Sequence, residues 1–122
     1  MTPRRQLGDA GEQMAFGRLI LDGLIVLDRN VRTPSGEIDI VARDGDDIAF
    51  VEVRTRRGEP GDAAESITRA KLARMWQCAE EYCEANNLMF ETARVDVMTV
   101  DLGLAGRGPV LIEHLRAVEL PE

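Results

Sequence analysis

Hydrophobic residues follow two different periods along this 122-residue chain. They recur every three to four positions over residues 6–21, and again from a capping pattern at Asp62 and Glu65 to about Asn86, which predicts two helices. Shorter segments that alternate or are rich in β-branched residues predict five strands, at residues 24–31, 37–43, 48–53, 92–100 and 110–115. The order α-β-β-β-α-β-β predicts an α/β fold in which a mixed sheet is flanked by helices.

The first predicted helix contains three glycines, at positions 8, 11 and 17, and each weakens a helix by roughly 1 kcal/mol relative to alanine. We expect close approach of the helix to other backbone to compensate for them. The apolar residues of this helix form two neighbouring stripes. One contains Leu7, Ala10, Met14 and Leu21, and the other contains Ala15, Phe16, Leu19 and Ile20. Glu12 lies one turn before Phe16, on the stripe that should face inward.

The second and third predicted strands are joined by Asp44-Gly45, and an Asp-Gly pair between strands is a strong hairpin signal. If this pair is the whole loop, the residue numbers of opposed residues sum to 89, and Asp39 opposes Phe50. If the loop is residues 44–47, the sum is 91, and Asp39 opposes Glu52. A slip of one residue would separate the acidic residues of the two strands. Both loops instead gather four charged side chains on one face: Glu37, Asp39, Glu52 and Arg54.

Carboxylates that are crowded and partly dehydrated cost free energy, so a fold that gathers them usually binds a cation there. Mg²⁺ takes one or two protein carboxylates together with water and phosphate oxygens, and Asp39 and Glu52 suffice for this. The Val53 carbonyl would add a ligand, and Glu12 or Glu37 would hold a metal-bound water or a second ion. The pattern therefore predicts a Mg²⁺ or Mn²⁺ site suited to phosphodiester hydrolysis. Taken alone, solvated acids beside a turn are the competing interpretation.

The net charge of −7 argues against binding of nucleic acid by bulk attraction, so phosphate contacts require a local basic patch. Arg54 should point to the same face as Glu52, because side chains in a strand repeat every two residues. Lys71 is the single lysine among fifteen basic residues. For Arg69 and Arg74 a solvated helix face is an equal alternative. The predicted nucleic-acid-binding residues are Arg54, Thr55, Arg56, Arg57, Arg69 and Arg74.

The length and the 44% hydrophobic content fit one domain, residues 1–122. The sequence has no apolar run of eighteen residues, and its first residues are polar, so we expect a soluble cytoplasmic protein without a membrane partner. Cys78 and Cys83 would lie about 140° apart around a helix, which predicts reduced, packed thiols. His114 is expected to be a structural hydrogen-bonding residue, and Trp76 and Tyr82 are expected to be core residues.

Several motifs occur in an order that is informative as a set: Gly11-Glu12, Gly36-Glu37-Ile38-Asp39, Ala42-Arg43-Asp44-Gly45, Phe50-Val51-Glu52-Val53-Arg54-Thr55-Arg56, a helix around Lys71, Arg94-Val95-Asp96-Val97 and Ile112-Glu113-His114-Leu115. Because it contains these motifs in this order, the chain resembles the YraN family of small bacterial proteins over nearly its whole length. That family is grouped with restriction-endonuclease-like and Holliday-junction-resolvase-like nucleases. The resemblance therefore implies a restriction-endonuclease-like α-β-β-β-α-β core and metal-dependent cleavage of DNA.

Under this resemblance Glu12 matches the helix glutamate, Asp39 the metal-binding aspartate and Glu52 the second metal carboxylate. The chain departs from the family at Arg54, where the motif ordinarily has lysine. A lysine can help to deprotonate the attacking water, whereas arginine, with a pKa above about 12, can only stabilise negative charge. Lys71 is the candidate substitute for the missing amine.

Two functions are therefore expected. The first is a Mg²⁺-dependent, structure-selective endonuclease that acts on branched or single-stranded DNA, and a homodimer would present two such sites. The alternative is a nuclease-fold module that binds nucleic acid or a protein partner with weakened or absent catalysis.

Overall fold

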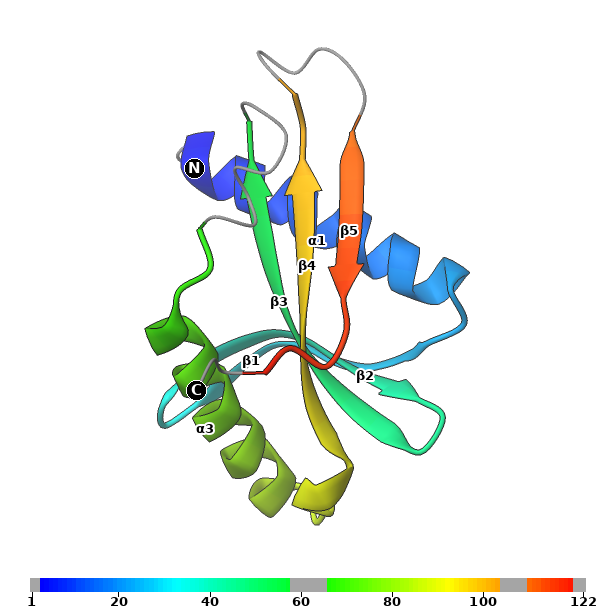
Figure 1. Cartoon of the computed structure of the whole chain (residues 1–122), viewed down its shortest axis with the longest axis vertical. Coiled ribbons are helices and arrows are strands. Elements are labelled where there is room, and N and C mark those ends of the chain that lie inside the picture. The colour runs from blue at the N-terminus through cyan, green and yellow to red at the C-terminus, as the bar shows by residue number, and fades with distance from the viewer. Residues whose placement is uncertain (1–2, 58–65, 104–109, 120–122) are drawn as a thin grey trace.

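A computed structural model describes residues 3–57, 66–103 and 110–119 (Figure 1). The described residues form a sheet of five strands, two α-helices and a short 3₁₀ helix. In chain order these are α1 (Pro3–Leu21), β1 (Ile25–Thr33), β2 (Gly36–Asp44), β3 (Asp47–Arg56), α3 (Arg69–Ala85), η1 (Phe90–Thr92), β4 (Ala93–Asp101) and β5 (Leu111–Leu115). The predicted α/β class and order of elements are confirmed.

The strands lie side by side in the order β1-β2-β3-β4-β5. β1, β2 and β3 form an antiparallel meander, β4 runs parallel to β3 after the α3 crossover, and β5 returns antiparallel to β4. Figure 1 shows α1 crossing behind β3, β4 and β5. This mixed sheet agrees with the core that the family resemblance implies. In the described residues, no helix is both long and apolar enough to span a membrane.

Each face of the sheet has its own apolar core. On one face Ala15 and Leu19 of α1 pack in a cluster with residues of β2, β3 and β4, including Ile40, Val51 and Met98. On the other face α3 packs over Phe50.

The α3 face contains the residues that the sequence predicted to be core. Cys78 and Cys83 are free thiols that are both buried there, as predicted. Tyr82 is buried with its ring edge-on to Phe50, at a centroid distance of 5.6 Å. Trp76 is partly buried against a third cluster.

The structure corrects the start of the second long helix. α3 begins at Arg69, and its N-cap is Thr68, whose side chain accepts a hydrogen bond from the Lys71 N–H at 3.2 Å. The capping pattern at Asp62 and Glu65 lies outside the described residues. Threonine is itself a good N-cap, so a second capping signal six residues downstream competed with the one chosen from the sequence.

The structure confirms the predicted burial of Ala15 and Leu19 in α1 and corrects other members of the two stripes. The buried positions are Gly11, Ala15 and Leu19, spaced four apart. Met14 and Ile20 are exposed. The stripe is narrow because α1 approaches the sheet along its glycine: a Cβ placed on Gly11 would lie 1.7 Å from Thr55 Oγ1. Nothing lies within 4 Å of a Cβ placed on the other two helical glycines, so the predicted close approach is confirmed at Gly11 alone.

Gly11→Ala is expected to lower the free energy of unfolding by about 1–3 kcal/mol, because its methyl group must displace Thr55 or the helix. Gly17→Ala is the matched control. Its Cβ meets no atom, so it should raise the free energy of unfolding by about 0.5–1 kcal/mol. Urea unfolding followed by circular dichroism measures both values. Equal stability of the two variants would contradict the close packing of α1 on β3.

Candidate functional site

The register of the β2–β3 hairpin places Asp39 beside Glu52. Paired residues such as Ile40 and Val51 have numbers that sum to 91, which is the second of the two predicted registers. Asp44 pairs with Asp47, so the connecting loop is Gly45 and Asp46 alone. Gly45 has a φ of 61°, a conformation that glycine adopts at little cost.

β2 separates from β3 at Asp39, so that the two strands form a fork. The last pair of the ladder is Ile40 with Val51. Beyond this pair the Val53 N–H faces β2 and donates a hydrogen bond to Asp39 Oδ2 at 2.8 Å. In a regular antiparallel ladder a backbone carbonyl of β2 would accept this hydrogen bond. The irregularity continues into β1: Asn30, which the register places opposite Asp39, has a φ of 52°.

This fork changes how the acidic residues meet. Ile38 packs in the α3-side cluster and Ile40 in the α1-side cluster, so the alternation of β2 is interrupted at Asp39 between them. The prediction of one shared face assumed regular alternation and needs correction. The Asp39 carboxylate lies in the fork itself. Glu12 of α1 reaches it from one face of the sheet and shares a hydrogen bond with it, while Glu52 approaches from the other face.

The pKa values of these carboxyls are raised. Burial raises the pKa of Asp39 to about 7, and the nearby Glu12 and Glu37 add to the shift against the opposing hydrogen bond from Val53. Burial also raises the pKa of Glu52 to about 7, helped by Asp39 and opposed by Arg54. The pKa of Glu12 is raised chiefly by burial. Ionising this cluster therefore costs free energy that a bound cation would recover.

The raised pKa values predict that the metal-free protein loses stability as pH rises. Below about pH 4, Asp39 and Glu52 are protonated in both the folded and the unfolded state. Between about pH 4 and 7 the unfolded chain releases these protons while the folded protein keeps them, so the free energy of unfolding falls and then levels off. Urea unfolding across this range measures the slope, which should be shallower in Asp39→Asn. Equal slopes in wild type and variant would contradict the assignment.

Basic side chains lie next to Glu52. Arg54 Nη1 is 3.4 Å from Glu52 Oε1, and its Nε donates to Ser66 Oγ at 2.9 Å. Lys71 Nζ donates to the Ser66 carbonyl at 3.3 Å. The pKa of Lys71 is lowered, first by burial and then by Arg54, with further contributions from Arg56 and Arg74. The structure thus brings four of the predicted basic residues together beside the acidic cluster: Arg54, Arg56, Lys71 and Arg74.

Three other predicted nucleic-acid-binding residues lie apart from this group. Thr55 is only 5% exposed and packs beneath Gly11, so its side chain is turned away from the basic group, and its contact with nucleic acid stays a prediction. A side chain at this position points to the α1 face, opposite to its neighbours in β3. Arg57 and Arg69 are exposed, and no described contact ties them to the acidic cluster.

The residues present fit a hydrated divalent ion better than a protein cage. In the part of the chain that the structure describes, no three His, Cys, Asp or Glu side chains converge to hold a metal by themselves. Mg²⁺ does not need three, because it keeps several waters and takes substrate oxygens. Burial keeps the pKa values of Asp39 and Glu52 raised, although Arg54 lies beside Glu52. The Val53 carbonyl points to the same side of β3 as its N–H, towards Asp39. Glu37 lies on the rim of a small pocket beside Glu52.

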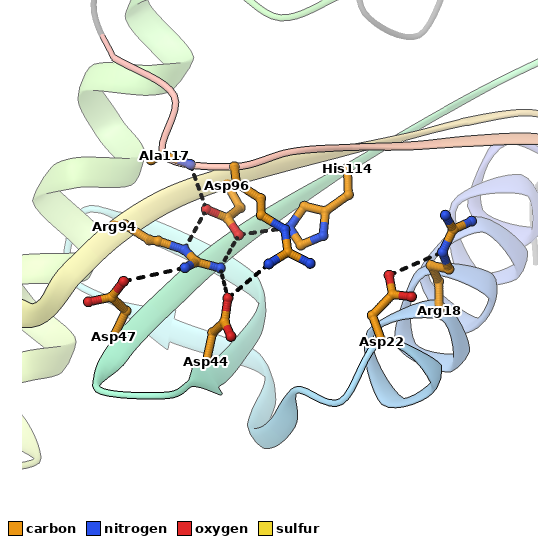
Figure 2. Close-up of polar contacts among 9 residues, drawn as sticks. Arg18, Asp22, Asp44, Asp47, Arg94, Asp96, His114 and Ala117 are labelled. Carbon is orange, nitrogen blue, oxygen red and sulfur yellow. Dashed lines mark hydrogen bonds and ion pairs between the residues drawn. The ribbon is translucent and has the colours of Figure 1, made fainter.

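Sequence reasoning missed a second polar cluster around Asp96, which is 0% exposed on β4 (Figure 2). Its carboxylate accepts hydrogen bonds from Arg94 Nε at 3.1 Å and from the Ala117 N–H at 3.0 Å, and it lies 2.7 Å from His114 Nε2. Burial alone would raise the pKa of Asp96, but these partners outweigh it and hold the pKa below its usual value. Arg94 also bonds Asp44 at 2.7 Å, which ties the β2–β3 hairpin to β4. His114 is therefore the structural residue that was predicted.

The sequence contained a signal for this cluster. Arg94 and Asp96 are two residues apart, and a charged pair at that spacing inside an apolar strand must lie on one face. An aspartate in the middle of a buried strand requires partners, because an unpaired buried carboxylate is very costly. Its other partners come from β5 and the segment after β5, and no local pattern identifies them.

The chain is similar to proteins of one family over most of its length. The sequence model of an uncharacterised protein family, UPF0102, matches residues 11–100. A UPF0102 protein of Roseiflexus castenholzii is 51% identical over 118 residues, which cover 94% of each chain. UPF0102 proteins of Chloroflexus aurantiacus and Arthrobacter sp. are 43% and 41% identical, covering 93% and 97% of this chain and 90% and 99% of theirs.

A comparison with solved structures finds Pyrococcus furiosus SfsA in complex with Ca²⁺, with a TM-score of 0.43 and 13% sequence identity. The similarity covers 95% of this chain and 65% of the SfsA chain, which is less than two thirds of its length.

Proposed function

This chain belongs to the UPF0102 family, which is the YraN family that its motifs indicated, and we propose that it is a divalent-metal-dependent endonuclease acting on branched or single-stranded DNA. The observation that supports the proposal most is the carboxyl cluster at the β2–β3 fork. Asp39 lies there with Glu12 on one side and Glu52 on the other, all three with raised pKa values, and the cations Arg54 and Lys71 lie beside Glu52. Metal-dependent phosphodiester hydrolysis uses this combination of cation-binding and phosphate-binding groups.

In this proposal Asp39 and Glu52 supply the carboxylate oxygens for Mg²⁺ or Mn²⁺, with the Val53 carbonyl as a further ligand. When bound, such an ion lowers the pKa of a coordinated water and offsets the charge of the phosphate. Glu12, which shares a hydrogen bond with Asp39, is placed to hold and orient a water molecule. Arg54 stabilises negative charge on the phosphate beside Glu52.

A cleavage assay tests the proposal. Branched, flapped, single-stranded and linear duplex DNA, together with a matched RNA, are incubated with the protein in Mg²⁺, in Mn²⁺ and in EDTA. We expect cleavage of branched or single-stranded DNA with either metal and none with EDTA. Sedimentation of the protein with branched DNA in Ca²⁺ shows whether a homodimer presents two sites. Binding without cleavage of any substrate would favour the alternative function.

The alternative is a nuclease-fold module that binds nucleic acid or a protein partner without cutting, and Arg54 is the observation that favours it. Arginine at this position cannot accept a proton from water. Arg54→Lys separates the two functions. A scaffold that lacks only the amine should gain metal-dependent cleavage, whereas an intact enzyme should change little.

If Lys71 supplies the missing amine, Lys71→Arg is expected to lower kcat by about a hundredfold, because it keeps the charge but loses the group that can transfer a proton. The lowered pKa of Lys71 and its position between Ser66 and Glu52 support this role. Arg18→Lys, an exchange of the same two residue types at an exposed position of α1 that pairs with Asp22, is the control and should leave kcat unchanged. Full activity of Lys71→Arg would show that proton transfer at this site needs no lysine.

A further inference from the structure

Arg29 of β1 lies beside the acidic cluster on the side opposite to Arg54 and Lys71. It pairs with Ile40 of β2, the residue next to Asp39, and Ile40 packs in the cluster under α1. The Arg29 side chain accordingly meets α1: its Cζ lies 4.3 Å from the centroid of the Phe16 ring, and its Nη2 donates to Gln13 Oε1 at 3.3 Å. The charge of Arg29 also acts on Glu12, one turn before Phe16.

The guanidinium of Arg29 is held in place by Gln13 and Phe16 but makes few hydrogen bonds within the described residues. A guanidinium has five N–H donors, and within the described residues that of Arg29 makes one hydrogen bond, to Gln13. Arg94 provides the contrast, because it bonds three carboxylates, those of Asp44, Asp47 and Asp96. Arg94 is committed to holding the fold together. Arg29 instead rests on an aromatic ring beside a cluster of carboxylates, and the contacts of the described residues leave most of its donors unused.

We propose that Arg29 binds a phosphate of the nucleic-acid strand on the α1 side of the acidic cluster. The inference rests on the proposed function. The planar guanidinium of arginine can donate to two phosphate oxygens at once. The Phe16 ring beneath it already restricts the side chain, so binding a phosphate costs less conformational entropy. A nucleic-acid strand would contact Arg29 on one side of the acidic cluster and Arg54 and Lys71 on the other. The phosphate between these two contacts would then lie over Asp39.

A purely structural role is the competing explanation, in which Arg29 only attaches β1 to α1 through Phe16. The two roles differ in their dependence on salt. Each phosphate contact contributes about 0.7 to the slope of log K against log salt concentration for single-stranded nucleic acid, and loss of a structural contact leaves that slope unchanged. Arg29→Gln removes the charge. Arg29→Lys keeps the positive charge and the aliphatic part of the side chain over the Phe16 ring, but it loses the planar guanidinium that can donate to two phosphate oxygens.

The experiment measures binding of a fluorescently labelled single-stranded DNA in Ca²⁺ by anisotropy, at several salt concentrations, and the cleavage kinetics in Mg²⁺. Arg43→Gln is the control, because it makes the same charge change at an exposed position of β2 away from the fork. We expect Arg29→Gln to lower the slope by about 0.7 and to raise KM about tenfold with kcat within a fewfold of wild type. Arg29→Lys should keep the slope with a smaller rise in KM, and Arg43→Gln should match wild type.

The results separate this inference from the proposed function. If the wild type cleaves DNA and Arg29→Gln keeps the slope and KM, the role of Arg29 is overturned and the nuclease proposal stands. If the wild type binds DNA without cleaving it, the nuclease proposal fails, while the salt slope still decides for or against a phosphate contact at Arg29. If the wild type binds no nucleic acid, both fail.

Discussion

Asp39→Asn and Glu52→Gln are each expected to lower the rate of metal-dependent DNA cleavage by about a thousandfold or more. A metal ion supplies several kcal/mol of transition-state charge stabilisation, and each 1.4 kcal/mol corresponds to about tenfold in rate. Both substitutions preserve the shape of the side chain, and the amide oxygen that Asp39→Asn introduces can still accept the hydrogen bond from the Val53 N–H. Loss of activity can therefore be separated from loss of the fold.

Asp46→Asn is the matched control for these variants, because it makes the same chemical change in the exposed hairpin loop. It should leave the cleavage rate unchanged. At about pH 8 without metal, Asp39→Asn should also be more stable than wild type, because it removes an ionised carboxylate from a crowded, buried site. Cleavage that persists at the wild-type rate in both Asp39→Asn and Glu52→Gln would come from another site or a contaminant, and the proposed site would be wrong.

Asp96→Ala is expected to lower the free energy of unfolding by about 3–5 kcal/mol, which is a large share of the stability of a domain of this size. The reason is the position of Asp96 at the centre of its cluster. Its carboxylate is completely buried and is the shared partner of Arg94, His114 and the Ala117 N–H. Its removal leaves the buried imidazole of His114 without this partner and takes away one of the three carboxylates that Arg94 bonds. Urea unfolding at neutral pH measures the loss.

Asp47→Ala is the control, because it removes another carboxylate partner of the same arginine. Its side chain is 56% exposed and lies 3.4 Å from Arg94, so water can replace it, and the expected change is below about 1 kcal/mol. A comparable loss in the two variants would mean that Arg94 is held by the sum of its partners. A loss confined to Asp96→Ala would show that the buried carboxylate organises the cluster.

Most of the fold was predictable because its elements are encoded locally. Apolar side chains that recur every second residue in a strand, or every three to four residues in a helix, indicate which face of the element is buried. The pair Asp44-Gly45 indicates the hairpin. The errors arose where several local signals competed. Thr68 caps α3, which therefore begins at Arg69, later than predicted, and Met14 of the first predicted α1 stripe is exposed.

The candidate site was predicted only in part. Asp39, Glu52 and Glu12 were identified from the sequence, and the structure brings them together. The sequence left two registers open, and it gave no sign of the fork that turns Asp39 towards the Val53 N–H. Asn30 was the available hint, since asparagine is one of the few residues that tolerate a positive φ.

The sequence by itself determined the class of fold, the order of its elements and the identity of the acidic residues, because these depend on residue type and on short-range periodicity. The tertiary structure alone decided the register of the hairpin, the divergence of β2 from β3 and the partners of Asp96. It also placed Arg29 against Phe16 beside the cluster. These features depend on contacts between segments far apart in the chain, whose geometry is set by how the two helices and the sheet pack together.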